Sequence, residues 1–211
     1  KASIDMALHD IVGKTWNEPI WRILGGYRTE RVETDFTISI DKPKLMAEKG
    51  RDLVESGFET LKVKVGNDPE QDLRRIEEIR KAIGNETAIR IDANQGWSRV
   101  EASNALRKME PLEIQFAEQP LPASDIEGMA QLRYKSPVPI MADESAHGPA
   151  DAMRIIDEEA ADFINIKLGK SGGFYRAKQI AQISEAAHVP NMVGGMASTD
   201  LLATAASHLA G

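Results

Sequence analysis

The chain contains no cysteine and no long apolar stretch, and these absences exclude several classes of protein. Its 211 residues have no means of forming disulfides, a thiolate nucleophile or a cysteine-ligated zinc or iron–sulfur site. No apolar run reaches the roughly 18 residues of a membrane helix, and no signal-peptide pattern is present. We therefore expect no contact with membrane, and a cytoplasmic location, which suits a chain without thiols.

An excess of basic residues is missing as well. The formal net charge is −7, so the composition offers no basic surface for nucleic acid or for an anionic membrane. A hydrophobic content of 42% with 28% charged residues is ordinary for a globular protein. Because the chain starts at Lys1 within a helical pattern and stops at Gly211 just after another, we expect it to be part of a longer protein.

Short apolar runs alternate with amphipathic helical patterns through most of the chain. Strands are predicted at 33–39, 60–65, 88–92, 114–118, 139–142, 163–167 and 191–193. A helix is predicted after each strand, at 43–56, 68–83, 99–109, 125–134, 149–158, 173–187 and 199–209. Residues 1–26 are also predicted to be helical. Apolar residues recur at helical intervals in the first part of this segment, and the helix continues over 16–24 until Gly25-Gly26 ends it. This alternation predicts a parallel α/β architecture.

Three of the predicted strands carry a carboxylate at the C-terminal end, namely Asp92, Glu118 and Asp143. Their spacing is close to one βα unit of about 25 to 35 residues, so each belongs to its own parallel strand. Asp92 alone would be read as an N-cap, but Ser98 is better placed to cap the next helix. Three oxygen ligands at one edge of a sheet suit a hard divalent cation such as Mg²⁺.

Lysines lie before and after the three acids in the chain. Lys62 and Lys64 are two residues apart on one predicted strand, so both face the same way, and two adjacent ammonium groups lower the pKa of each. An edge strand with solvated lysines shows the same alternation. Lys167 ends the sixth predicted strand. It is either an acid–base group or the ion-pair partner of one of the three acids. Two amides share faces with these groups, Asn94 and Asn165.

These charged groups decide between two α/β architectures. In an open, doubly wound sheet the outer strands lie far apart, whereas charged groups on five neighbouring strands converge if the sheet closes on itself. We therefore predict a (β/α) barrel for residues 27–211, preceded by the helical segment 1–26, with no separate second domain in this chain.

Taken in order, the motifs of the chain resemble those of the enolase superfamily, and specifically its muconate-lactonising subgroup. They are ALHDIVGK, LGG, KVKVG, RIDANQGW, EQP, ADES and NIKLGKSGG, and together they cover essentially the whole chain. The resemblance implies a modified TIM barrel of the (β/α)7β type. It also implies Mg²⁺ held by Asp92, Glu118 and Asp143, with Lys64 and Lys167 on opposite faces of the substrate α-carbon.

The reaction that this resemblance implies is removal of the proton α to a carboxylate, followed by reprotonation on the opposite face. The segment 33–40 looks most like the first strand of dipeptide epimerases such as the L-Ala-D/L-Glu epimerases, so a dipeptide is the expected small-molecule substrate. o-Succinylbenzoate synthase with N-succinylamino acid racemase activity and muconate-type cycloisomerase are the alternatives. A homo-oligomer is expected. The expected substrate-binding or electrostatic residues are Lys62, Asn94, Asn165, Thr37 and Met196.

Two features of the family are absent from this chain. One is the N-terminal capping domain, to which the segment 1–26 would connect, and the other is the eighth strand of the barrel. A barrel without that strand has open edges, so we expect a partial sequence or completion by another segment. Two interpretations lie outside this class: a Schiff-base lyase, which needs an interior lysine but no metal ligands, and a non-catalytic binding barrel.

Overall fold

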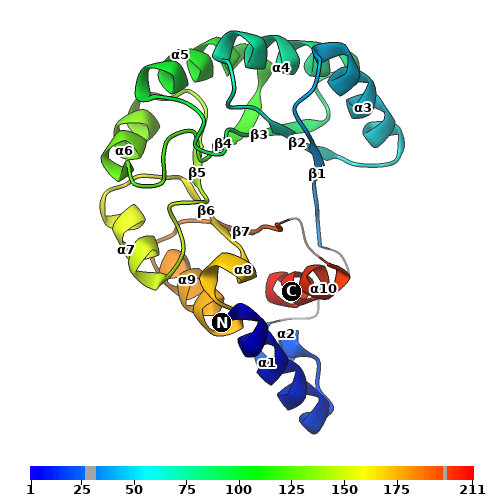
Figure 1. The fold of residues 1–211 in the computed structure, drawn as a ribbon, viewed down its shortest axis with the longest axis vertical. Coiled ribbons are helices and arrows are strands. Elements are labelled where there is room, and N and C mark those ends of the chain that lie inside the picture. The colour runs from blue at the N-terminus through cyan, green and yellow to red at the C-terminus, as the bar shows by residue number, and fades with distance from the viewer. Residues whose placement is uncertain (27–31, 197–198) are drawn as a thin grey trace. The chain divides into compact units, whose positions relative to one another are not determined.

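The computed structural model describes residues 1–26, 32–196 and 199–211. By its internal contacts the chain divides into two compact units. Unit 1 comprises Lys1–Glu33, Ala146–Asp157 and Phe163–Gly211, and unit 2 comprises Thr34–Ser145 and Glu158–Asp162. Strands alternate with helices along the sequence in both units (Figure 1).

Unit 2 contains a parallel sheet whose strands pair in sequence order. The strands are β1 (Phe36–Ile38), β2 (Thr60–Lys64), β3 (Ala88–Asp92), β4 (Ile114–Glu118) and β5 (Ile140–Ala142). The connecting helices are α3 (Pro43–Glu55), α4 (Pro69–Ile83), α5 (Arg99–Met109) and α6 (Ile126–Lys135), with a 3₁₀ turn η1 (Glu110–Leu112) after α5. The four α-helices lie along one face of this sheet (Figure 1).

The core of unit 2 lies between the sheet and these helices. On β2, Leu61 and Val63 are fully buried, and on α4 the same holds for Ile76 and Ile79. Burying each such side chain stabilises the fold by about 1.5–3 kcal/mol. Because side chains alternate along a strand, burying Leu61 and Val63 against the helices places the intervening Lys62 on the opposite face of the sheet.

The strand register brings the predicted site residues to one edge of this sheet. Lys64 is paired with Asp92 across β2 and β3, and Asp92 is paired with Glu118 across β3 and β4. Glu118 is paired in turn with Met141 of β5. These side chains therefore start from the same level, at the C-terminal ends of adjacent parallel strands.

Unit 1 is mostly helical. Its helices are α1 (Ala2–Trp16), α2 (Ile20–Ile23), α7 (Pro149–Asp157), α8 (Leu168–Ser171), α9 (Phe174–Ala186) and α10 (Asp200–Ala210). Its strands β6 (Phe163–Ile166) and β7 (Asn191–Val193) pair in parallel. The N-terminus of α9 is held by α1, since the Phe174 backbone N–H donates to Asp5 Oδ2 at 2.6 Å. None of the helices in the described ranges is long and apolar enough to cross a membrane.

Several expected elements have different bounds in the structure. The helix does not continue through 16–24, because Asn17 adopts a left-handed conformation with φ 53° and Pro19 precedes the separate helix α2. The first strand covers Phe36–Ile38 and not 33–39. Helix α8, directly after Lys167, is absent from the sequence-based prediction. The predicted start of the barrel, at residue 27, lies outside the described residues.

Candidate active site

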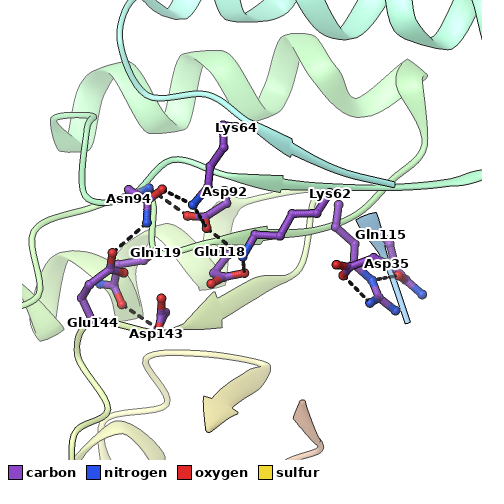
Figure 2. Close-up of polar contacts among 11 residues, drawn as sticks. Asp35, Lys62, Lys64, Asp92, Asn94, Gln115, Glu118, Gln119, Asp143 and Glu144 are labelled. Atoms are coloured by element: carbon purple, nitrogen blue, oxygen red, sulfur yellow. Dashed lines mark hydrogen bonds and ion pairs between the residues drawn. The ribbon is translucent and has the colours of Figure 1, made fainter. Parts of the chain in front are cut away.

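Two lysines and two carboxylates interlock at the C-terminal ends of β2, β3 and β4 (Figure 2). Lys62 Nζ lies 2.8 Å from Asp92 Oδ2 and 2.6 Å from Glu118 Oε2. Lys64 Nζ donates to the same Asp92 oxygen at 2.7 Å and also to Asn94 Oδ1. Asp92 therefore forms ion pairs with two ammonium groups, and Lys62 connects the C-terminal ends of β3 and β4.

Burial and charge act in opposite directions on this cluster. Burial has the largest single effect on the Lys62 pKa and acts to lower it, but the charges of Glu118 and Asp92 and their hydrogen bonds together raise that pKa above its ordinary value. Burial likewise acts to raise the Asp92 pKa, and the two ammonium groups hold that pKa below its ordinary value. The sequence-based expectation that neighbouring lysines lower each other's pKa is therefore wrong for Lys62, because the carboxylates dominate.

The two lysines differ in their access to solvent. The Lys64 side chain is 30% exposed, whereas that of Lys62 is 11% exposed and that of Asp92 is fully buried. Asn94 extends the cluster towards β5, since its Nδ2 donates to Glu144 Oε1 at 2.9 Å. The backbone N–H of Asn94 also donates to Asp92 Oδ1 at 3.0 Å. Lys64 is thus the more accessible cation in a network of fixed hydrogen bonds.

The chemistry of the acids fits a divalent cation. Among the residues that the structure describes, no group of three or more histidine, cysteine or acidic side chains could hold a metal ion as they stand. Asp92, Glu118 and Asp143 are nevertheless buried carboxylates from three neighbouring strands, and a positive charge already lies between Asp92 and Glu118. Oxygen ligands of this kind suit Mg²⁺. The assignment of all three as metal ligands stays a prediction.

Another buried carboxylate, outside the cluster, holds the loops that follow β2 and β3. Asp72 of α4 accepts from the Gly66 N–H at 2.8 Å and from Trp97 Nε1 at 3.2 Å, and Arg75 Nη1 donates to it at 2.6 Å. The two loops touch directly, since a Cβ added to Gly96 would lie 2.1 Å from Gly66 O. The backbone beyond Lys64 and Asp92 is therefore fixed from outside the cluster.

The remaining predicted residues belong to other elements of the chain. Thr37 of β1 is paired with Lys62 in the strand register, and it is exposed. Lys167, which is 9% exposed, precedes α8 in unit 1. Asn165 is buried in β6 of the same unit, and Met196, also in unit 1, is 55% exposed. The placement of two lysines on opposite faces of a substrate stays a prediction.

Three polar residues with direct roles around the cluster were not predicted: Asp72, Gln119 and Glu144. Asp72 lies on a helix, and the helical pattern does not distinguish a buried acid from an exposed one. Its partners Gly66 and Trp97 belong to the KVKVG and RIDANQGW motifs, whose glycine and tryptophan indicate closely packed loops. Gln119 and Glu144 each follow a predicted ligand directly in the EQP and ADES motifs. Their adjacency to Glu118 and Asp143 is the signal that would have identified them.

Comparisons with known proteins point to one family. The family model described as Enolase C-terminal domain-like matches residues 45–211. The chain is 44% identical, along its whole length, to 59% of an L-Ala-D/L-Glu epimerase from Clostridium acetobutylicum. It is 39% identical, again along its whole length, to 57% of an N-succinyl-L-Arg/Lys racemase from Bacillus cereus.

A solved structure gives the same result. The dipeptide epimerase from Enterococcus faecalis, complexed with Mg and the dipeptide L-Leu-L-Tyr, matches 98% of this chain with a TM-score of 0.95 and 40% identity. The match covers 58% of that structure. The predicted fold class, an α/β chain forming part of a TIM barrel, is confirmed. The chain spans less than two thirds of the length of the curated relatives it matches.

Proposed function

Because the chain belongs to the Enolase C-terminal domain-like family, we propose that it carries the barrel machinery of a Mg²⁺-dependent dipeptide epimerase. The proposed reaction inverts the carbon α to a carboxylate by a 1,1-proton transfer. The observation that carries the proposal is the interlocked cluster of Lys62, Lys64, Asp92 and Glu118 at adjacent strand ends. Buried charges of both signs at the same edge of a sheet suit proton transfer beside a cation better than they suit a structural core.

The three carboxylates would hold the metal. In this proposal Asp92, Glu118 and Asp143 are the ligands, and the bound Mg²⁺ supplies positive charge where negative charge develops on the substrate carboxylate. The relative from Enterococcus faecalis, which was solved with Mg and a dipeptide, supports this assignment.

The two lysines on β2 would have different roles. Lys64 is the acid–base group because its ammonium is the more exposed of the two and lies at the very end of the strand. Lys62 lies deeper, between Asp92 and Glu118, so we assign it an electrostatic role without proton transfer. Lys167 would exchange the proton on the opposite face of the α-carbon. Asn94 would orient Lys64, to which it is hydrogen-bonded.

The substrate class has one alternative with its own support. A dipeptide is favoured because the 44% identical relative is an L-Ala-D/L-Glu epimerase. An N-succinylamino acid is the alternative, because a relative 39% identical is an N-succinyl-L-Arg/Lys racemase. Both substrates carry an α-proton next to a carboxylate, so the same lysines would serve either. A homo-oligomeric, cytoplasmic protein stays a prediction.

Proton exchange in heavy water tests the proposal. The full-length protein with Mg²⁺ is given each epimer of an Ala–Glu dipeptide in D₂O, and deuterium at the α-carbon is followed by NMR. We expect Lys64→Ala and Lys167→Ala each to abolish epimerisation, while each spares exchange in one epimer only, because the two bases face opposite sides. Loss of a general base lowers the rate by about 10²–10⁴-fold.

The matched control is Lys108→Ala in unit 2, the unit that contains Lys64. Lys108 is half exposed and forms an ion pair with Glu70, away from the cluster. The Lys108→Ala variant should leave the exchange of the α-proton unchanged. If neither Lys64→Ala nor Lys167→Ala reduced exchange, the two-base mechanism would be wrong. Exchange with N-succinylamino acids but not with dipeptides would retain the mechanism and change the substrate.

A further inference from the structure

One glutamine side chain joins the ends of β4 and β5 in unit 2 (Figure 2). Gln119 follows Glu118 directly and is completely buried. Its Oε1 accepts the backbone N–H of Asp143 at 2.9 Å and that of Ser145 at 3.1 Å. Its Nε2 donates to Leu121 O at 3.0 Å and to Ser145 Oγ at 2.8 Å. Both halves of the amide are therefore fully used.

The backbone of Gln119 is fixed in the same way. Its N–H donates to Met141 O at 2.8 Å, and its carbonyl accepts the Gln95 N–H at 2.8 Å. Its φ of 37° lies in the left-handed region, which is uncommon for a residue other than glycine. Such a conformation persists where the surroundings over-determine it. Here five hydrogen bonds to the loops after β3, β4 and β5 and a sixth to β5 itself do so.

We infer that Gln119 is a positioning residue that sets the spacing between two of the proposed metal ligands, Glu118 and Asp143. Glu118 is its neighbour along the chain, and Asp143 is bound to its side chain through the backbone N–H. A change in the amide therefore displaces one ligand relative to the other. Mg²⁺ is sensitive to such a displacement because it demands near-octahedral geometry at about 2.0–2.1 Å. This inference rests on the proposed function.

The amide is the group that this position requires. A carboxylate in its place would turn an acceptor towards Leu121 O, and it would add a negative charge beside Glu118 and Asp143. A methionine has nearly the same shape but makes none of the four hydrogen bonds. Gln119→Met therefore removes the connection between β4 and β5 without adding a charge.

The same strand offers a matched control at its other end. At the start of β5, Asp162 Oδ2 accepts the Ile140 N–H at 2.8 Å, and Asp162 Oδ1 accepts from Arg133 Nε at 2.7 Å. Asp162 thus anchors the backbone of β5 as Gln119 does, but away from the proposed ligands. Asp162→Asn should weaken the fold with no effect on the metal.

The test measures Mg²⁺ binding to the full-length protein by titration calorimetry and thermal unfolding in parallel. We expect Gln119→Met to weaken Mg²⁺ binding by about tenfold or more, the usual effect of losing a residue that orients a metal ligand. Asp162→Asn should lower the unfolding midpoint while its Mg²⁺ affinity stays within about twofold of the wild type. If Gln119→Met and Asp162→Asn both lowered only the midpoint, the inference would be overturned and Gln119 would be structural.

Two further results separate this inference from the proposed function. If the wild-type protein bound no Mg²⁺, the metal-dependent function and the positioning role would both be wrong. If Gln119→Met did not fold, Ser145→Ala replaces it. This variant removes the 2.8 Å contact to Nε2 and the 3.1 Å hydrogen bond from Ser145 Oγ to Ala123 O, but it leaves the Asp143 contact in place. We expect that variant to weaken Mg²⁺ binding by about threefold, and an unchanged affinity would overturn the inference.

Discussion

Buried cations at the two ends of the parallel strands in unit 2, Arg80 at one end and the lysines of β2 at the other, are neutralised differently. At the N-terminal ends, Arg80 of α4 donates to neutral backbone carbonyls, including Leu112 O at 3.0 Å and Thr87 O at 2.8 Å. At the C-terminal ends, Lys62 and Lys64 are paired with carboxylates. The guanidinium that is bound to backbone carbonyls is fixed in one position. An ammonium group that is paired with carboxylates can be displaced by a different cation, and this property suits a metal-binding site.

The largest effect is expected where one of the exchangeable charges is removed. Glu118→Gln keeps the shape of the side chain but leaves Lys62 with a single carboxylate partner and removes one proposed ligand. We expect Mg²⁺ binding and activity to fall together, the activity by about 10²-fold or more. Calorimetry and steady-state kinetics on the full-length protein measure both. An unchanged Mg²⁺ affinity would remove Glu118 from the ligand set.

The other end of the strands should respond in stability alone. Arg80→Met leaves the carbonyls of Gly84, Thr87 and Leu112 without their donor. The Thr87 carbonyl is buried and the other two are partly buried. A buried acceptor that loses its partner is costly, so we expect the free energy of unfolding to fall by about 1–3 kcal/mol. Chemical denaturation measures this change. Mg²⁺ affinity should be unaltered, and a loss of affinity comparable to that of Glu118→Gln would show that the two ends are not independent.

Lys62→Met tests whether the charge at the C-terminal ends is exchangeable. The variant leaves the buried Asp92 and Glu118 without the ammonium between them, so we expect the metal-free protein to lose about 3–5 kcal/mol of stability. Added Mg²⁺ should restore more stability to this variant than to the wild type, because the cation no longer competes with Lys62. Thermal unfolding with and without Mg²⁺ measures the difference. An equal gain in both proteins would mean that Lys62 and the metal do not share these carboxylates.

The smallest effect is expected at the exposed cap of α5. Hydrogen bonds from Ser98 hold the pKa of Glu101 below its ordinary value. A lowered pKa means that the ionised group stabilises the fold above its ordinary pKa, and this contribution is lost as the pH falls below about 4.5. Glu101→Gln should therefore lower the unfolding midpoint slightly at pH 7 and leave it unchanged at low pH. Thermal scans across the acid range would reveal an equal loss at both pH values if the ionised group had no role.

Much of the fold followed from local patterns. The bounds of β3, β4, β7 and α5 match the predicted ranges, because periodic apolar residues and a capping box mark them in the sequence. The break between α1 and α2 was missed, since it depends on a left-handed Asn17 within an otherwise helical pattern. Helix α8 was missed because a single turn has too few residues to show a period.

The candidate site was predicted from the positions of its residues along the chain, and their contacts could not be predicted in this way. Equal spacing of acids along the chain identified Asp92, Glu118 and Asp143 as one edge of a sheet. The raised pKa of Lys62 was not foreseen, because it depends on distances to carboxylates on other strands. The hydrogen bond from Asp143 to Gln119 was not foreseen for the same reason, because Asp143 follows the next strand, although the adjacency of Gln119 to Glu118 was visible in the sequence.

Metal-dependent exchange of the substrate α-proton tests the central claim most directly. The full-length wild-type protein, freed of metal by a chelator, is mixed with an Ala–Glu dipeptide in D₂O before and after Mg²⁺ is added back. The account predicts no deuterium at the α-carbon without metal, and both deuterium and the second epimer once Mg²⁺ is restored. Exchange at the same rate without metal would contradict it, and trapping of the substrate by borohydride would then indicate Schiff-base chemistry at a lysine.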